Sequence, residues 1–187
     1  MNQLLQDFHY FFYYSLKQPW FFTEYGFLLT LAIFLIGYAF FTPKSQWKLG
    51  YLIAFSLFFY YKSSGPFLLL FIGVILCDYV LARWLSTLEG SKRKVLLFFS
   101  IVYGLSFLLY FKYSNLVITN INTLFETKFT TKTLFLPIGI SFYTFQTISY
   151  TIDVYRGEVR AQKNWLNFML FVVCFHQLVA GPIVRYS

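Results

Sequence analysis

Charged residues are scarce in this sequence. Only 12% of its 187 residues are Asp, Glu, Lys or Arg, whereas 58% are hydrophobic and 25% are aromatic. A soluble domain of this length keeps many residues at its surface, so it could not bury that much apolar area. The composition therefore excludes an ordinary soluble domain. It predicts an all-α fold class, a polytopic transmembrane helical bundle.

Residue types that form metal sites or disulfides are also few. Cys77 and Cys174 both lie in apolar runs, and their spacing fits neither a disulfide framework nor a metal site. The two histidines are His9 and His176, and no Gly-rich phosphate loop, HExxH, GxSxG or CxxC motif is present. We therefore predict no metal site, and the local motifs leave the chemistry open.

Long apolar runs are what the sequence does contain. A helix needs about 20 apolar residues to cross a hydrocarbon core about 30 Å thick. Six stretches approach this length: Tyr25–Phe41, Leu49–Tyr61, Phe67–Leu85, Val95–Phe111, Leu134–Ile152 and Trp165–Val184. The second crosses only if Lys48 and Lys62 snorkel from its ends, and the last is broken at Gly181-Pro182, as in a re-entrant segment. We expect one transmembrane domain over residues 1–187 with about six membrane segments.

The amino terminus has a different character. Its stretch "FHYFFYYSLKQPWFF", Phe8–Phe22, is too short and too polar to span, yet it is dense in aromatic residues. Aromatic side chains of this kind gather at the membrane–water boundary. We expect residues 1–23 to form an interfacial helix.

Positive charge is unevenly distributed among the connections between these segments. If all six segments cross, five basic residues lie on one side of the membrane and nine lie on the other. The positive-inside rule then places "EGSKRK" and "YRGEVRAQK" in the cytoplasm and the amino terminus outside it. Such clusters orient a protein and contact headgroups, which explains the net charge of +8 more simply than nucleic-acid binding does.

The stretch "LPIGISFYTFQTISYTIDVYRG", Leu136–Gly157, combines an apolar background with hydroxyls, an amide and a carboxylate. Helical periodicity places Gln146, Ser149 and Asp153 on one stripe, and other polar residues lie all round the helix. Polar groups are costly in hydrocarbon without partners, so we expect other helices to enclose this one. The alternative for the Ser and Thr hydroxyls is a structural role, in which they form hydrogen bonds to their own helix or to neighbouring helices. Gln146 and Asp153 are better candidates for lining a site.

Two further polar positions fall inside apolar runs. Asp78 needs a cation or donors at that depth, and we expect a structural ion pair with Arg83 rather than a catalytic role. His176 lies beside Gln177 before the Gly-Pro break, and a buried imidazole can act as a general base. Without a visible partner, His176 is better explained as a hydrogen-bonded packing residue. The residues alone leave a catalyst and a conduit as alternatives.

Two stretches resemble a known family. "LPIGISFYTFQTISYTIDVYRGE" followed by "FHQLVAGPIVRYS" is similar to the signature region of the membrane-bound O-acyltransferases, in particular the bacterial alginate O-acetyltransferase branch. "FSLFFYYKSSG", "CDYVLAR" and "YFKYSN" support the resemblance in the same order. One departure is His176, which stands where similar proteins commonly have Pro.

The resemblance implies an enzyme of the bacterial inner membrane that moves an acyl group, acetyl by analogy, to hydroxyls of an extracytoplasmic polysaccharide. Family members continue past the second motif, and their catalytic histidine lies in that part. We therefore expect this chain to be an amino-terminal fragment without a catalytic residue, inactive alone. The implied donor is acetyl-CoA or an acylated carrier from the cytoplasmic side, with no bound cofactor. The implied partners are the lipid bilayer and envelope proteins of polysaccharide acetylation.

The resemblance also gives the polar positions a role as the wall of a tunnel. The expected lining residues are Ser141, Tyr143, Gln146, Tyr150, Asp153, Gln177 and Arg185. Arg156 and Arg160 would attract an anionic donor or contact headgroups. The alternative is a non-enzymatic bundle, either a small transporter or an assembly partner.

Overall fold

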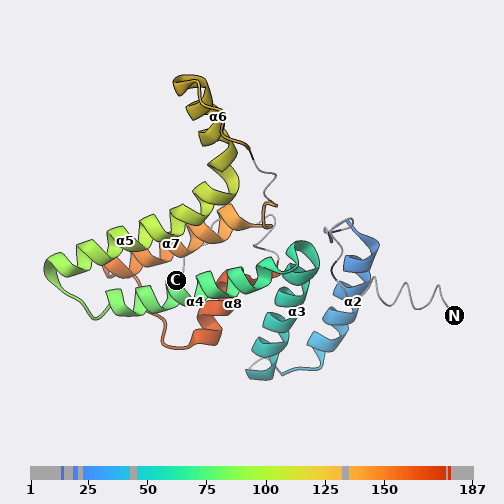
Figure 1. Cartoon of the computed structure of the whole chain (residues 1–187). Helices are drawn as coiled ribbons and strands as arrows, with labels where there is room; N and C mark the ends of the chain where they lie inside the picture. The colour runs from blue at the N-terminus through green and yellow to red at the C-terminus, as the bar shows by residue number, and fades with distance from the viewer. Residues whose placement is uncertain are drawn as a thin grey trace.

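The computed structural model describes residues 14, 19–20, 23–42, 46–131, 135–175 and 177. All regular structure in these ranges is helical (Figure 1), which confirms the all-α prediction for them. The elements are α2 (Tyr25–Ala39), α3 (Gln46–Ser64), α4 (Phe67–Leu85), α5 (Gly90–Leu108), the π-helical turn η1 (Leu109–Tyr113), α6 (Ser114–Phe125), α7 (Ile140–Arg156) and α8 (Trp165–Val173).

Two helices in the described ranges are long and apolar enough to cross a membrane. One is α4, which has the predicted bounds, and the other is the continuous helix Gly90–Phe125. The apolar helix α2 is shorter, and α8 ends at Val173, with most residues beyond it outside the described ranges. Six membrane segments therefore stay a prediction.

The helix expected over Val95–Phe111 is much longer at both ends. It begins at Gly90, so the basic residues of "EGSKRK" form its first turn rather than a loop. It passes through "YFKYSN" by way of η1 and continues as α6, which points away from the bundle (Figure 1). Lys, Tyr and Asn are all tolerated within a helix, so polarity at this position does not end it.

α6 ends in a tightly bonded turn. Glu126 adopts a left-handed conformation with φ 52°. The Asn122 side chain donates to the Phe129 carbonyl at 2.8 Å, and it accepts from the Phe129 amide at 2.9 Å and the Thr127 hydroxyl at 3.0 Å. These bonds hold the turn that follows the helix.

α3 is longer than the predicted run Leu49–Tyr61 and spans 19 residues. The prediction made crossing by this segment conditional on snorkelling by Lys48 and Lys62. In the structure Lys62 is buried and its ammonium lies over the Trp20 ring, 4.8 Å from the centroid. The helix gains its length instead from polar residues at both ends. An aromatic side chain thus offers the Lys62 ammonium a partner within the protein.

α7 begins six residues later than the run predicted from Leu134, because Pro137 and Gly139 form a turn before it. Gly139 has φ 73° and Gly157, just after the helix, has φ 78°, a conformation that favours glycine at both positions. α7 packs against α4, α5 and α8. Gly104 of α5 permits the close approach, since a Cβ there would lie 3.3 Å from Ile148.

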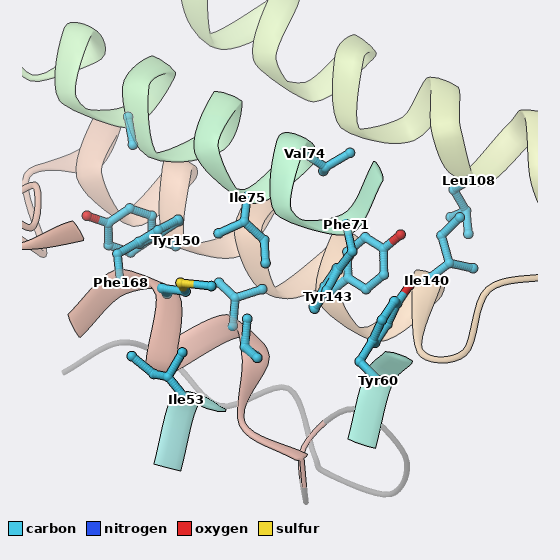
Figure 2. Packing of buried hydrophobic residues seen from close by; sticks show 14 of the residues in the cluster. Ile53, Tyr60, Phe71, Val74, Ile75, Leu108, Ile140, Tyr143, Tyr150 and Phe168 are labelled. Atoms are coloured by element: carbon cyan, nitrogen blue, oxygen red, sulfur yellow. The ribbon is translucent and has the colours of Figure 1, made fainter. Parts of the chain in front are cut away.

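The core lies where α3, α4, α7 and α8 meet. In Figure 2, Tyr60 of α3, Phe71 of α4 and Tyr143 of α7 stand side by side. The first two rings stack at 4.2 Å, and Phe71 lies 4.8 Å from Tyr143. A second, aromatic cluster joins α2 to α3 through Trp20, Phe27, Phe34, Phe55 and Phe59. The first cluster holds α7 inside the bundle, and the second holds α2 against α3.

Candidate functional site: the polar interior around α7

α7 carries its polar residues into the protein interior. Its buried residues include Tyr143, Thr144, Gln146, Thr147, Tyr150, Thr151 and Asp153. The prediction that other helices pack around the polar residues of α7 is therefore confirmed for these buried positions. Described residues do not cover it completely, because Phe142 and Phe145 are 41% and 44% exposed.

Two of the buried hydroxyls bond within α7. The Thr147 hydroxyl donates to the Thr144 carbonyl at 3.2 Å, and the Thr151 hydroxyl donates to the Thr147 carbonyl at 2.9 Å. Such bonds satisfy the hydroxyl without any ligand. The structural alternative holds for these two residues.

Gln146 and Gln177 are brought together. The Gln146 amide nitrogen donates to the Phe171 carbonyl at 2.6 Å and to the Gln177 side-chain oxygen at 3.1 Å. This pair joins α7 to the end of α8, where Cys174 interrupts the helix. Two residues predicted to line the same path thus share one polar contact.

The other predicted lining residues in the described ranges make contacts of their own. Tyr150 accepts a bond from the Gln162 amide at 2.7 Å, so its hydroxyl holds the connection between α7 and α8. Asp153 is buried near the end of α7. Ser141 lines a cavity of about 360 Å³ at the start of α7, together with Ser63 and Pro137. Arg185 and His176 lie outside the described residues.

Asp78 is the buried carboxylate on α4. Its Oδ2 has no hydrogen-bond partner among the described residues. The Thr147 side chain lies beside the Asp78 carboxylate. Tyr143 and Tyr103 are close enough to interact electrostatically with it. The buried hydroxyls of Tyr60 and Tyr143 also have no hydrogen-bond partner within the described part of the chain.

The expected ion pair between Asp78 and Arg83 is not formed. In the described ranges the one ion pair joins Arg156 to Glu158 at 3.7 Å. Arg83 is exposed, and its guanidinium donates instead to the Lys163 carbonyl at 3.4 Å. Two residues that are five positions apart on an α-helix differ by about 140° in direction. The side chains of Asp78 and Arg83 therefore leave α4 on different sides.

Sequence reasoning missed the contributions of α3 and α5 to this interior. Tyr60 and Ser64 come from "FSLFFYYKSSG", and the Ser64 hydroxyl accepts the Ile138 amide at 3.0 Å before α7 begins. Tyr103 comes from α5. The signal that could have identified these residues was their polarity within apolar runs. Their spacing resembled that of ordinary interfacial residues, so it did not set them apart.

The polar interior therefore has two parts. One is the Gln146–Gln177 pair between α7 and α8, and the other surrounds Asp78 between α4, α5 and α7. Hydroxyl, amide and carboxylate groups can orient a polar acyl carbonyl or a sugar hydroxyl by hydrogen bonding. No described residue combines with them as an obvious nucleophile–base pair.

Curated proteins similar to this chain carry acetylation names. The chain is 38% identical over 165 residues to the probable alginate O-acetylase AlgI of Pseudomonas aeruginosa, covering 85% of this chain and 31% of that protein. The AlgI of Azotobacter vinelandii is 36% identical over 166 residues, covering 84% and 32%. A peptidoglycan O-acetyltransferase of Helicobacter pylori is 31% identical over 162 residues, covering 73% and 31%.

The chain thus spans about a third of the length of these relatives. No family model and no solved structure matches it. The apolar helices and the relatives together identify a membrane protein. The similarities confirm the resemblance that the motifs indicated, to the alginate O-acetylase branch of the membrane-bound O-acyltransferases.

Proposed function

We propose that the whole protein is an O-acetyltransferase that modifies hydroxyls of an extracytoplasmic polysaccharide. The observation that carries the proposal is similarity over 85% of this chain to a probable alginate O-acetylase. A relative with a peptidoglycan O-acetyltransferase name supports the same reaction class on a different polymer. The acceptor chemistry shared by both names is a sugar hydroxyl.

In this reaction a sugar hydroxyl attacks the acetyl carbonyl of a thioester, which is acetyl-CoA or an acylated carrier. A C–O bond forms, the C–S bond breaks, and the hydroxyl proton passes through a general base to the leaving thiolate. No residue of this chain is assigned as that base. The buried donors and acceptors around α7 would orient the acetyl group and keep water from it.

The proposal includes a membrane arrangement. About six segments cross the bacterial inner membrane, and the amino terminus is extracytoplasmic. The basic first turn of α5 then faces the cytoplasm, as the positive-inside rule requires. The donor enters from that side, and envelope proteins of polysaccharide acetylation receive the product.

The test is acetyl transfer by the whole protein in membrane vesicles. Labelled acetyl-CoA is supplied on the cytoplasmic side, and label is measured on oligosaccharides of alginate or peptidoglycan. Replacing Gln146 by Leu should reduce transfer on the order of tenfold, because it removes bonds to Phe171 and Gln177 from the path. Ser106→Ala is the matched control, since the Ser106 hydroxyl is exposed and bonds only locally to Tyr103.

Two results would overturn this function. One is the absence of label on any sugar polymer although the protein is correctly inserted. The other is passage of a solute through the protein without acetyl transfer, which would favour the small transporter. Equal activity of the two variants would agree with the proposed enzyme but would show that Gln146 does not line the acetyl path.

A further inference from the structure

An apolar groove lies on the outer face of the α4–α5 hairpin, away from the polar interior. It has a volume of about 690 Å³ and is lined by Trp84, Leu88, Ser91, Lys92, Val95, Leu96 and Phe99. The residues come from the end of α4 and the beginning of α5, which run side by side from one turn (Figure 1). Trp84, Val95 and Phe99 are each more than half exposed, so the groove is open.

The groove has a polar end and an apolar end. Lys92, Val95, Leu96 and Phe99 follow the i, i+3, i+4, i+7 spacing and therefore share one face of α5. Lys92 stands in the first turn, and Phe99 lies about 10 Å further along the helix, deeper in the span. An ammonium group at the membrane boundary is thus followed by hydrocarbon and aromatic side chains.

The neighbouring cations do not all point into this groove. Arg93 turns toward α7, where its guanidinium donates to the Val154 carbonyl at 3.0 Å and lies over the Tyr155 ring. Lys94 is exposed and is not part of the lining. Arg93 therefore anchors the hairpin to the bundle, while Lys92 presents its charge at the groove.

The charge around the groove is positive. Arg83, Lys92, Arg93 and Lys94 are basic, and Glu89 is the acidic residue of this region. Four positive charges and one negative charge leave a local excess of three. A ligand that matches both the charge and the polarity of the groove has an anionic head and hydrocarbon chains.

We propose that this groove is a binding site for an anionic phospholipid. The phosphate lies at Lys92 and Ser91, and an acyl chain follows Val95 and Phe99 beside the Trp84 ring. Trp and Lys at such a boundary favour lipid headgroups, and a basic residue near an anionic surface strengthens binding about fivefold. The site is separate from the proposed acetyl path.

The test uses quenching of Trp84 fluorescence by brominated lipids. The intact protein is reconstituted in phosphatidylcholine bilayers that contain increasing fractions of brominated phosphatidylglycerol or brominated phosphatidylcholine. The Trp84→Phe variant gives the signal of the other tryptophans, which is subtracted. We expect half-maximal quenching at about a fivefold lower fraction of phosphatidylglycerol than of phosphatidylcholine.

Two lysine variants decide whether the site is specific. Lys92→Gln should remove the preference for phosphatidylglycerol, whereas Lys94→Gln removes the same charge from the same turn and should retain most of it. Equal losses in both variants would overturn the site in favour of diffuse attraction. Equal quenching by the two lipids would also overturn it. Trp84 that neither lipid quenches would mean that protein covers the groove.

Discussion

Helices α2 and α7 are both rich in aromatic residues, but they place polarity in opposite ways. α2 consists largely of apolar residues and buries two of them, Phe27 and Phe34. α7 mixes polar and apolar residues and buries nine, most of them polar or tyrosine. In a membrane the interior of the protein is the place where polar groups find partners, whereas lipid accepts an apolar helix directly.

Burial, rather than hydropathy, therefore distinguishes the polar interior of this bundle from its apolar outer helices. Length and hydropathy identify α4 and the continuous helix Gly90–Phe125 as candidate membrane spans, yet both expose large apolar side chains. α7 is the less apolar helix and lies at the contact of three others. The same substitution should therefore change the unfolding free energy much more at a buried position than at an exposed one.

The largest effect is expected from removing an aromatic ring in the interior. Phe71 is fully buried between Tyr60 and Tyr143, so Phe71→Ala leaves a cavity and should cost about 3–5 kcal/mol of unfolding free energy. Phe98→Ala removes the same ring from a position that is 63% exposed on α5, and should cost less than about 1 kcal/mol. Reversible unfolding in mixed micelles measures both. Similar losses would contradict the assignment of an inner and an outer face.

A glycine pair tests how tightly α7 is held. Gly104→Leu pushes a side chain against Ile148 and Thr144 of α7, and overpacking of this kind should cost about 1–3 kcal/mol. Gly73→Leu on α4 meets no atom within 4 Å of its new Cβ and should be neutral or slightly stabilising, because Leu favours helices more than Gly. Thermal unfolding of the purified protein compares them. A stable Gly104→Leu protein would mean that α7 can move away from α5.

Much of this arrangement was accessible from the sequence. The bounds of α4 and the start of α2 follow from uninterrupted apolar runs with Pro or charge at their edges. The enclosed position of α7 follows from polar residues on every stripe. These predictions succeed because they depend on composition within one helix.

The remainder depends on contacts between distant segments. Ser64 bonds to Ile138, 74 residues away, and Gln146 bonds to Gln177, 31 residues away. No local pattern selects those partners. The Asp78–Arg83 prediction used separation along the chain and neglected direction around the helix, and the extension of α5 into α6 required a turn geometry that composition does not encode.

A smaller effect is expected at the amide pair. Gln146→Leu and Gln177→Leu each remove one side of a bond of 3.1 Å, and each should cost about 1–2 kcal/mol. In a double-mutant cycle the two changes should couple by about 0.5–1.5 kcal/mol, because the second change has no bond left to remove. Pairing Gln146→Leu with Ser106→Ala should give additive losses. Additivity in the Gln146–Gln177 cycle as well would show that the two amides act independently.

The smallest effect is expected at Arg83. Its size shows whether Arg83 neutralises the buried Asp78 carboxylate or not. If Arg83 neutralised a buried Asp78, Arg83→Gln would leave an uncompensated charge and cost about 3–5 kcal/mol. Because the guanidinium lies exposed and, among the described residues, donates only to the Lys163 carbonyl at 3.4 Å, we expect a change within about 0.5 kcal/mol. Asp78→Leu provides the internal comparison, since it removes the buried carboxylate itself beside Thr147. Unfolding free energies of the two single variants and the double variant should add, because no ion pair links the residues. A large loss in Arg83→Gln that Asp78→Leu abolishes would restore the pair and would place the polar interior within reach of the outer face of α4.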